Sequence, residues 1–528
     1  MTNPTRSPAT LAGLSVVDTF VSAKRPLISR GIEKEGLRAT PSFDITQTNH
    51  PSALGHPLTH PSITTDYSEA LLELITSVHP SRSGLLNELT EVHAFVQANI
   101  GDELLWPGSM PCRIDGNNSI RIAEYGNSNT GQLKTVYRRG LDVRYGRVMQ
   151  SIAGLHYNFS LSDEFWLALQ QQQENKQTLK DFKSDRFFSL IRNFRRHSWL
   201  LMYLFGASPA LDKSFVGERS DHGLIPFDNF GTLYKPYACS LRMGDLGYHN
   251  NAQADLNICF NTLENFTNTL GHAIKTPYPA YEAIGLEQNG QRVQLNTNIL
   301  QIENEYYSSL RPKRTTKSGE KPTAALIDRG VEYIEVRCMD LNPMLPLGIS
   351  ASEVDFIDLL LVHSLLNPSS YIDDAGCEEL EQNFSSVVNE GRKPGLTLRR
   401  NGKNIPLADW GEALINEMKG IAEVLDKENT DQRYHKTLET QARKLADISL
   451  TPSAQVLAKM QDKQQSWLAF AAEQAQQHRS TSENLSEQTR NLIHVRYKEQ
   501  AAESFKQEQQ RKAEDTMSFS DFLKSYQA

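Results

Sequence analysis

This sequence of 528 residues lacks the features that place a protein in a membrane or on nucleic acid. Its apolar runs all fall short of the roughly 20 residues that a membrane-spanning helix needs. It also lacks a basic surplus, because 55 Lys and Arg stand against 63 Asp and Glu and the formal net charge is -8. No global positive field attracts nucleic acid or an anionic bilayer, so we expect neither partner.

Cysteine is scarce, and the five that occur form no CxxC pair and no zinc-like spacing. Their odd count and wide spacing fit free thiols in a reducing compartment. The N-terminal residues carry no compact basic region ahead of their short apolar stretch, so we expect an untargeted, cytoplasmic protein. One thiol acting as a nucleophile is an alternative, but a small buried side chain is the commoner role. The five are Cys112, Cys239, Cys259, Cys338 and Cys377.

Several catalytic motifs are also missing. The sequence contains no GxxxxGK[ST] loop, so a Walker-type nucleotide site is not predicted. It contains no GxSxG elbow and no HExxH pair, which argues against an α/β-hydrolase and against a zincin.

What the chain does contain is a strand-rich first part followed by a helical second part. Short strand-like runs and Gly/Asn turns fill 28–160 and 220–345, and the alternation in Leu256–Asn261 predicts a half-buried strand. Helical patterns are predicted at 1–20, at 161–205 with a polar interruption at 170–176, at 354–366, at 408–447 and at 453–515.

This distribution predicts an α+β fold in which a mainly antiparallel sheet carries the site and helices surround it. We expect one unit over 1–528, with a sheet region at 28–400 and a mainly helical part at 401–528. The charged helical pattern near the end is typical of a solvated helix.

Four predicted strands place polar groups on one face with a period of two. Each group alternates with apolar neighbours, and Glu73 is a lone charge in LLELIT shortly after Thr64-Thr65-Asp66. The groups are Glu33 and Glu35, Glu73, then His156, Asn158 and Ser160, and finally Glu335 and Arg337.

A carboxylate inside an apolar strand is costly unless it is paired or bound to a cation. Several such strands in one sheet would bring their carboxylates together, and Mg²⁺ suits a set of oxygen ligands whose shell phosphate can complete. For any single strand, a half-exposed, salt-bridged position is the commoner explanation. The four strands together favour a site.

A set of basic residues lies in or beside Gly-, Tyr- and Asn-rich stretches. Arginine suits bidentate recognition of phosphate and carboxylate, although solvated surface is the commoner role for any one of these residues. The set is Arg38, Lys134, Arg138, Arg139, Arg242, Arg311, Lys313, Arg314 and Arg337.

Ten ordered blocks between about residues 30 and 400 resemble the glutamate–cysteine ligases of the gamma-proteobacterial type. They are RGIEKEGLR (30–38), LTHPSITTDYSEALLELIT (58–76), GDELLWPGSMPC (101–112), YGNSNTGQLKTVYRRGL (125–141), RYGRVMQSIAGLHYNFS (144–160), YLFGASPA (203–210), YACSLRMGDLGY (237–248), LQIENEYYSSLRPKR (300–314), GVEYIEVRCMDLNP (330–343) and EGRKPGLTL (390–398).

The resemblance implies a fold similar to the catalytic domain of glutamine synthetase, with a curved antiparallel sheet that binds ATP, metal ions and two amino acids. It implies metal ligands at Glu33, Glu35, Asp66, Glu73, His156 and Glu335. It implies phosphate contacts at Arg138 and Arg337, and a cysteine pocket of Tyr67, Tyr137, Leu141, Arg242, Tyr248 and Tyr307. The family pattern leads us to expect Phe at position 67, so the Tyr67 hydroxyl is a departure. His156 is a softer ligand that also accepts Mn²⁺.

The implied reaction joins the γ-carboxylate of L-glutamate to the amine of L-cysteine. ATP phosphorylates the carboxylate, and γ-glutamylcysteine, ADP and phosphate leave; glutathione is expected to inhibit by competing with glutamate. Two rivals stay open, namely a ligase of the same fold with another amine acceptor and a metal-dependent phosphohydrolase. A purely binding role has the least support.

Overall fold

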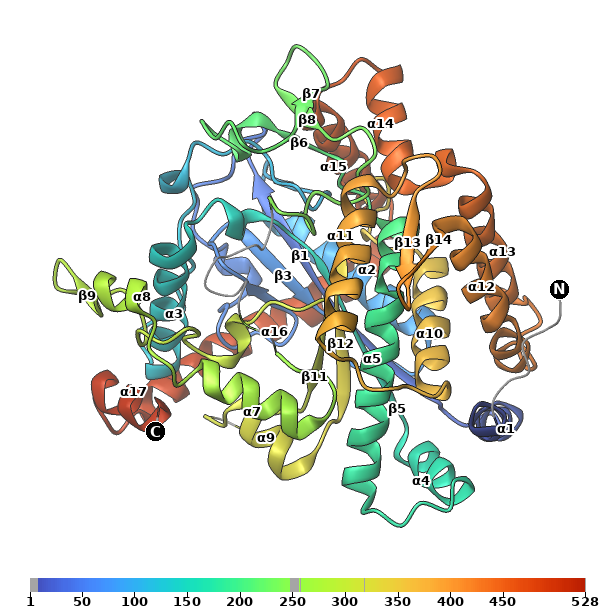
Figure 1. Cartoon of the computed structure of the whole chain (residues 1–528). Helices are drawn as coiled ribbons and strands as arrows, with labels where there is room; N and C mark the ends of the chain where they lie inside the picture. Colours follow the sequence, from blue (N-terminus) through green and yellow to red (C-terminus); the bar gives the residue numbers. More distant parts are fainter. Residues whose placement is uncertain (1–7, 247–255, 257, 318, 528) are drawn as a thin grey trace.

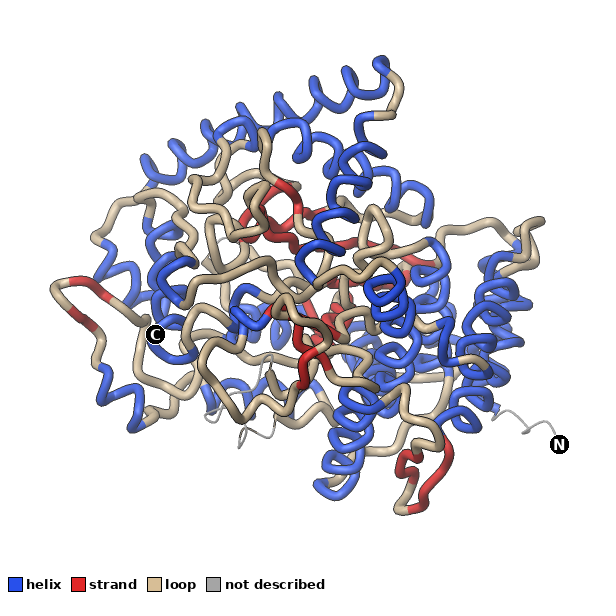
Figure 2. The backbone as a smooth tube through the Cα atoms, turned by 90° about the horizontal axis from the view of Figure 1, so that it is seen from above, coloured by secondary structure: helices blue, strands red, loops and turns tan. Residues whose placement is uncertain are grey.

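The computed structural model of the chain describes residues 8–246, 256, 258–317 and 319–527. A seven-stranded sheet with antiparallel pairing throughout lies at its centre, and helices surround it (Figures 1 and 2). The strand order is β11-β12-β5-β1-β3-β2, with β4 paired to the end of β1. The α+β prediction is therefore confirmed. The strands are β1 (Ile28–Ala39), β2 (Ile63–Thr65), β3 (Leu71–Ile75), β4 (Leu104–Leu105), β5 (Leu155–Leu161), β11 (Leu310–Lys313) and β12 (Tyr333–Met339).

The register of these strands places the polar groups on one face, here called the carboxylate face. Strand β1 pairs with both β5 and β3, so that Glu33 lies opposite His156 and Glu35 lies opposite Glu73. In the next pair, Glu335 of β12 lies opposite Asn158 of β5. Because side chains alternate along a strand, these groups share one side of the sheet.

The other face of the sheet is mainly apolar and packs on helices. Ile32, Phe159 and Val336 are fully buried there. Helix α5 (Leu179–Phe205) contacts β12, α2 (Arg82–Asn99) contacts β1 and β3, and α10 (Ala351–Leu366) packs on α5. Helix α10 begins at the Ser350–Glu353 capping box, and the described side chains of its second half are buried. This layer fixes the sheet from behind and leaves the carboxylate face free for function.

A buried ion pair ties this helical layer to the sheet. The Arg30 guanidinium donates to Asp358 of α10 at 2.8 and 2.6 Å, and the Tyr157 hydroxyl donates to the same carboxylate at 2.8 Å. Removing either partner would leave an uncompensated buried charge, which is why such pairs are intolerant of single substitution. The contact holds β1 and β5, the two strands that carry Glu33 and His156, against α10.

The sequence pattern missed several helices and placed one strand wrongly. Helices α2 and α3 (Asn129–Tyr145) lie where strands and turns were predicted, and each begins at a serine cap, Ser81 and Ser128. Three more, α7 (Leu263–Ala273), α8 (Pro279–Ile284) and α9 (Pro322–Arg329), interrupt the second strand-rich region.

The prediction of a strand at Leu256–Asn261 is wrong, because residues 256 and 258–261 form no strand in the described structure. The Asn261 side chain instead exchanges hydrogen bonds with the backbone of Ile372, and Thr262 caps α7 immediately afterwards. This tertiary contact outweighs the local alternation of apolar and polar residues.

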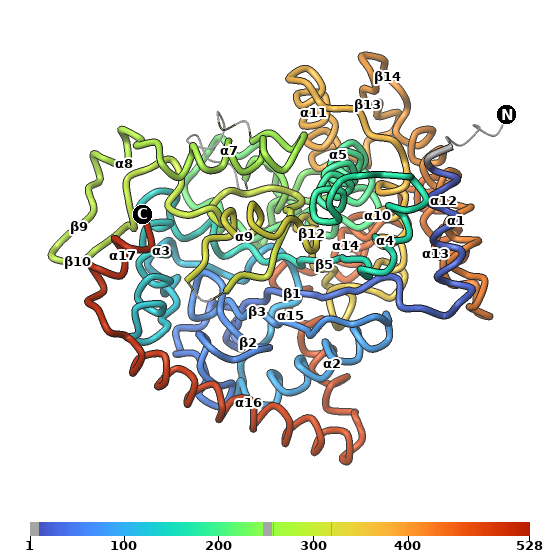
Figure 3. Tube along the Cα trace, turned by 90° about the horizontal axis from the view of Figure 1, so that it is seen from below, coloured from blue at the N-terminus to red at the C-terminus, as the bar shows by residue number. Residues whose placement is uncertain are grey.

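The last helices cross the molecule and reach the elements that carry the site (Figure 3). We call residues 487–527, which include α16 (Glu487–Glu514) and α17 (Phe519–Gln527), the C-terminal strap. Ser504 accepts a hydrogen bond from the His56 amide at 2.8 Å, and Asp515 accepts one from the Asn129 amide at 2.7 Å. Leu523 packs with Val136 of α3. The predicted solvated helix is thus an intramolecular clamp on α3, although its outer face is exposed.

The remaining elements complete the outer layer. No helix among the described residues has the length and apolar character that crossing a membrane requires. These elements are α1 (Pro8–Ser22), α4 (Asp163–Gln172), β6 (Ala210–Asp212), β7 (Ile225–Pro226), β8 (Thr232–Tyr234), β9 (Glu287–Gln288), β10 (Gln291–Arg292), α11 (Asp374–Glu390), β13 (Thr397–Arg400), β14 (Lys403–Pro406), α12 (Leu407–Leu425), α13 (Arg433–Ala446), α14 (Pro452–Asp462) and α15 (Trp467–Glu483).

Candidate active site

His156 stands at the centre of a group of carboxylates on the carboxylate face. Its Nδ1 lies 3.2 Å from a Glu33 oxygen and 3.8 Å from a Glu335 oxygen, and its Nε2 lies 3.7 Å from a Glu35 oxygen. Ligand atoms of Glu33, Glu73 and His156 all lie within 4.8 Å of one another. Three strands therefore place oxygen and nitrogen ligand atoms close enough together to bind one cation.

The carboxylates of this cluster differ in the direction in which their pKa values are shifted. Burial raises the pKa of Glu73 well above its ordinary value, and the charges of Glu33, Asp66 and Glu35 raise it further. Burial also raises the pKa of Glu35. So many buried carboxylates without an equal number of cations are a poor arrangement for a protein alone. The donor set, mostly hard oxygens, fits a divalent cation such as Mg²⁺.

Glu335 is held at the basic edge of this cluster. The Arg337 guanidinium donates to Glu335 at 3.1 Å, and the Lys313 ammonium lies 3.5 Å from its other oxygen. Burial opposes ionisation of Glu335, but the charges of Lys313 and Arg337 outweigh it and its pKa lies well below the ordinary value. Glu335 of β12 thus lies between two basic side chains, Arg337 of the same strand and Lys313 of β11.

Arg138 approaches the same face from helix α3. Its side chain is buried, its Nε donates to the Asp66 backbone carbonyl, and its guanidinium carbon lies 4.5 Å from the centre of the Tyr125 ring. The Tyr125 hydroxyl in turn donates to the Thr65 carbonyl at 2.6 Å. These contacts fix the Arg138 guanidinium beside the segment that joins β2 to Glu73, close to the carboxylate cluster.

A small cavity of about 120 Å³ opens between the cluster and α3. It is smaller than the few hundred Å³ of a drug-sized site, so it fits a ligand of amino-acid size. The Tyr67 hydroxyl is buried and has no hydrogen-bond partner among the described residues, so it is free to meet a ligand. The lining residues are Glu35, Asp66, Tyr67, Tyr137, Arg138, Leu141, Tyr145, Met149, Gln150, Asn304, Glu305, Tyr306, Tyr307, Arg311 and Arg337.

Arg242 lies behind this cavity and does not line it. Its guanidinium donates to the Arg337 carbonyl at 2.9 Å and lies 3.7 Å from Asp340, whose carboxylate accepts from Ser208 and Ser240. It passes so close to Gly154 that a Cβ at that position would overlap it. Arg242 is therefore a buried, fixed cation next to the cavity wall.

The structure brings together most of the residues that the resemblance implies. Glu33, Glu35, Glu73, His156 and Glu335 share the carboxylate face, and Asp66, Tyr67, Tyr137, Leu141 and Tyr307 surround the cavity with Arg138 and Arg337. Tyr248 lies outside the described residues.

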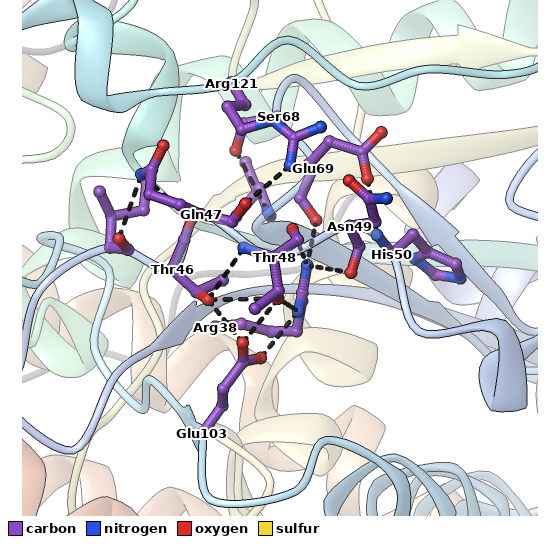
Figure 4. Close-up of polar contacts among 12 residues, drawn as sticks. Arg38, Thr46, Gln47, Thr48, Asn49, His50, Ser68, Glu69, Glu103 and Arg121 are labelled. Carbon is purple, nitrogen blue, oxygen red and sulfur yellow. Dashed lines mark hydrogen bonds and ion pairs between the residues drawn. The ribbon is translucent and has the colours of Figure 1, made fainter.

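The sequence pattern missed some residues of the cavity and misjudged one cation. Tyr145 was not predicted; it follows Tyr137 and Leu141, which the family resemblance implies, at a spacing of four and lines the same cavity, a signal that was hidden because a helix was not predicted there. Arg38, counted among the basic set, is fully buried and donates to Glu103 at 2.7 Å, to Thr48 and to the Glu69 carbonyl (Figure 4). Both terminal nitrogens of its guanidinium are bonded to the protein, so Arg38 has a structural role.

Comparison with known proteins gives a consistent result. The family model described as glutamate–cysteine ligase matches residues 22–387. A glutamate–cysteine ligase of Azotobacter vinelandii is 49% identical over 503 residues, covering 94% of each chain, and one of Hahella chejuensis is 50% identical over 507 residues, covering 94% of this chain and 95% of that one.

The chain belongs to the glutamate–cysteine ligase family. It is therefore an enzyme of the ligase class, and the resemblance drawn from the ten blocks is confirmed.

Solved structures agree with this family assignment. The glutamate–cysteine ligase of Francisella tularensis in complex with AMP superposes with a TM-score of 0.88 at 37% identity, covering 95% of this chain and 97% of that chain. A bifunctional glutathione synthetase of Pasteurella multocida has the same fold over 90% of this chain and 55% of that one, with a TM-score of 0.72 at 24% identity.

Proposed function

We propose that this ligase uses ATP to join the γ-carboxylate of L-glutamate to the amine of L-cysteine. The products are γ-glutamylcysteine, ADP and phosphate, and the reaction is the first step of glutathione biosynthesis. The observation that carries the proposal is the buried carboxylate cluster, flanked by Arg138 and Arg337, at the rim of a small tyrosine-lined cavity. The AMP-bound relative supports the use of a nucleotide.

In this proposal, the metal ligands are Glu33, Glu35, Asp66, Glu73, His156 and Glu335. Bound Mg²⁺ supplies charge neutralisation for the phosphates of ATP and lowers the repulsion felt by an anionic attacker. The imidazole of His156 makes Mn²⁺ an acceptable substitute. The site suits a divalent metal ion because its buried carboxylates outnumber the basic side chains that could balance their charge.

The chain's own residues would orient the reaction. An ionised carboxylate does not react with an amine, because oxide is a poor leaving group, so the γ-carboxylate is first phosphorylated to γ-glutamyl phosphate. Arg138 and Arg337 stabilise negative charge on the phosphoryl group as it moves. The cysteine amine then attacks the acyl carbon and phosphate leaves.

The cavity would hold the cysteine and exclude water from the acyl phosphate. Tyr67, Tyr137, Leu141, Tyr307 and the buried Arg242 border it or lie behind it, and Tyr248 belongs to the same proposal. A glutathione molecule shares its γ-glutamyl and cysteinyl groups with the substrates, so we propose that it inhibits by competing with glutamate. We further propose that the chain works as one catalytic unit, with 28–400 as the sheet region and 401–528 as its helical part, in the cytoplasm.

Product analysis by mass spectrometry with ATP, Mg²⁺, glutamate and cysteine tests the reaction. γ-Glutamylcysteine should form only when all components are present. Full-rate release of phosphate from ATP without either amino acid would instead favour a phosphohydrolase. Product formation with a different amine in place of cysteine would mean that the enzyme is a ligase with another amine acceptor.

Isotope transfer tests the intermediate. Glutamate labelled with ¹⁸O in its γ-carboxylate should give phosphate that carries one ¹⁸O per turnover, because one carboxylate oxygen leaves with the phosphoryl group. Label in AMP with release of pyrophosphate would mean an adenylate route. Unlabelled phosphate alongside γ-glutamylcysteine would contradict the acyl phosphate.

A further inference from the structure

Lys134 lies one helical turn before Arg138 on the same side of α3, outside the set of residues assigned above. Its ammonium nitrogen lies 5.0 Å from the centre of the Tyr125 ring, and the Arg138 guanidinium carbon lies 4.5 Å from that same ring. Residues four apart on a helix are neighbours. Tyr125, fixed by its hydroxyl at the Thr65 carbonyl, therefore holds two cations of α3 close together.

Apart from the Tyr125 ring, the Lys134 ammonium has no ion-pair partner among the described residues. It is half-buried and lies in the field of Glu73 and Asp66, yet none of the described carboxylates forms an ion pair with it. The neighbouring cations Arg138 and Arg337 are engaged, since Arg138 donates to the Asp66 carbonyl and Arg337 to Glu335. A half-buried ammonium without a counter-ion is costly, and a bound anion would remove that cost.

The order of groups along α3 indicates which anion this is. Leu141, Arg138 and Tyr137 all line the amino-acid cavity, whereas Lys134, about 6 Å of helix rise before Arg138, does not line it. In phosphoryl transfer the attacking and leaving oxygens are roughly in line on either side of the moving phosphorus. A group beyond Arg138, on the side away from the acceptor, therefore lies on the leaving-group side.

We propose that Lys134 binds the diphosphate of the nucleotide and stabilises the negative charge that ADP acquires as it leaves. The inference rests on the proposed function. In the step, a γ-carboxylate oxygen of glutamate bonds to the γ-phosphorus, the bond from that phosphorus to the β-bridging oxygen breaks, and the electron pair stays on ADP. A lysine ammonium suits this position because it acts as a point charge toward phosphate oxygens. Arg511 of the C-terminal strap adds positive charge to the same region.

The test compares Lys134→Gln, Lys134→Arg and the control Lys498→Gln, which removes an exposed lysine from the part of α16 that packs beside α2. Binding of ADP is measured by calorimetry at a fixed Mg²⁺ concentration, and KM is measured for ATP and for each amino acid. We expect Lys134→Gln to weaken ADP binding and to raise the KM for ATP, each about tenfold, with the KM for cysteine unchanged within about twofold. Lys134→Arg should recover most of the loss, and Lys498→Gln should match the wild type.

A second measurement uses only the wild-type protein. The rate at which an amine-reactive acylating reagent modifies Lys134 is followed by peptide mass spectrometry, with and without ADP, and with glutamate as the control ligand. ADP should slow the modification of Lys134, and glutamate should not. This result does not depend on the folding of any variant.

Unchanged ADP affinity in a folded Lys134→Gln protein, or equal acylation rates with and without ADP, would overturn the inference. A change confined to the KM for glutamate or cysteine would also overturn it, because Lys134 would then serve the acceptor side. If the wild type makes γ-glutamylcysteine and ADP binding ignores Lys134, only this inference fails. If no product forms while ADP binding depends on Lys134, the proposed function fails and the nucleotide contact stands.

Discussion

At the scale of single residues, charges on the carboxylate face that the proposed activity needs lower the stability of the folded protein. Ionised Glu73 is opposed by burial and by its acidic neighbours, which is why its pKa is raised. We predict that Glu73→Gln lowers turnover by at least about a hundredfold, the scale expected when a catalytic metal is mispositioned. The same change should raise the free energy of unfolding of the metal-free protein at pH 8, because it removes a charge that the fold disfavours.

Steady-state rates and urea unfolding in the presence of a chelator measure both quantities. Glu320→Gln is a matched control, since Glu320 is only partly buried and pairs with Arg329, away from the sheet. Near wild-type turnover in Glu73→Gln would remove Glu73 from the proposed metal ligands.

Gly154 is a second residue at which a single group decides the geometry of the site. Its amide donates to Glu35 at 2.5 Å, and the space that a Cβ would occupy is filled by the Arg242 guanidinium. We predict that Gly154→Ala raises the KM for cysteine about tenfold or more, because Arg242 must move from its position behind the cavity, where it donates to the Arg337 carbonyl. The KM for ATP should change much less.

Gly271→Ala supplies the control for this change, because Gly271 lies in helix α7 with open space at its Cβ position. It should leave kinetics unchanged and stabilise the helix by up to about 1 kcal/mol. An unchanged KM for cysteine in Gly154→Ala would show that Arg242 is dispensable for acceptor binding.

At the scale of elements, helix α3 and its cap connect the C-terminal strap to the site. Asp515 accepts a hydrogen bond from the Asn129 amide in the first turn of α3, where a negative charge is favourable. We predict that Asp515→Ala destabilises the protein by about 1 kcal/mol and lowers turnover, because α3 carries Tyr137, Arg138 and Leu141. Thermal unfolding and steady-state rates check this.

The neighbouring Glu514→Ala is the matched control for the cap, since Glu514 is exposed and accepts only from Gln510 of its own helix. If both variants behaved alike, the effect would come from general loss of charge in the strap.

Alternation along β1, β5 and β12 was enough to predict that Glu33, Glu35, His156 and Glu335 share faces, because period two is a local property of a strand. The pairing of β1 with both β3 and β5 is not local, and the family resemblance implied a curved antiparallel sheet but no strand order. Helix α3 was missed because its sequence is polar and Gly-containing, and its stability comes from Ser128, Asp515 and the packing of Val136 on Leu523.

Residues behind the site were the hardest to predict. Asp340 follows β12 and holds Arg242 through a network with Ser208 and Ser240, all from distant segments. Nothing in the local sequence around Asp340 signals those partners. Arg38 shows the opposite case, since phosphate recognition and solvated surface were both open for it, and its partners Glu103 and Thr48 instead make it structural.

At the scale of the whole molecule, buried neutral histidines make stability depend on pH. Burial lowers the pKa of His50 to about 3 and the pKa of His60 and His478 to about 4. In the unfolded chain each has a pKa near 6.5. As pH falls below about 6.5 the unfolded chain binds protons that the folded chain does not bind, until the folded pKa values are reached. We therefore predict that the free energy of unfolding falls between pH 6.5 and pH 4, by up to about 1.4 kcal/mol per pH unit for each histidine.

Urea unfolding at a series of pH values measures this slope. His60→Asn is the informative variant, because His60 Nδ1 accepts from the Ser62 and Ile63 amides and an asparagine carbonyl offers a similar acceptor without titrating. In this variant, the change of the free energy of unfolding with pH should correspond to the uptake of about one proton fewer on unfolding. A slope equal to that of the wild type would mean that His60 is protonated in the folded protein.

The strand order described above also determines how the protein must fold. Strand β1 lies at the centre of the sheet, yet its neighbours β3 and β5 come tens to more than a hundred residues later, and β12 follows some three hundred residues after β1 begins. Loop-closure entropy must be overcome before such non-local pairings gain any stabilising contact, and this slows folding. During that interval β1 has two unpaired edges, which are templates for pairing with other chains. Refolding yield should therefore fall steeply with protein concentration, and no short fragment of the chain will contain a working catalytic centre.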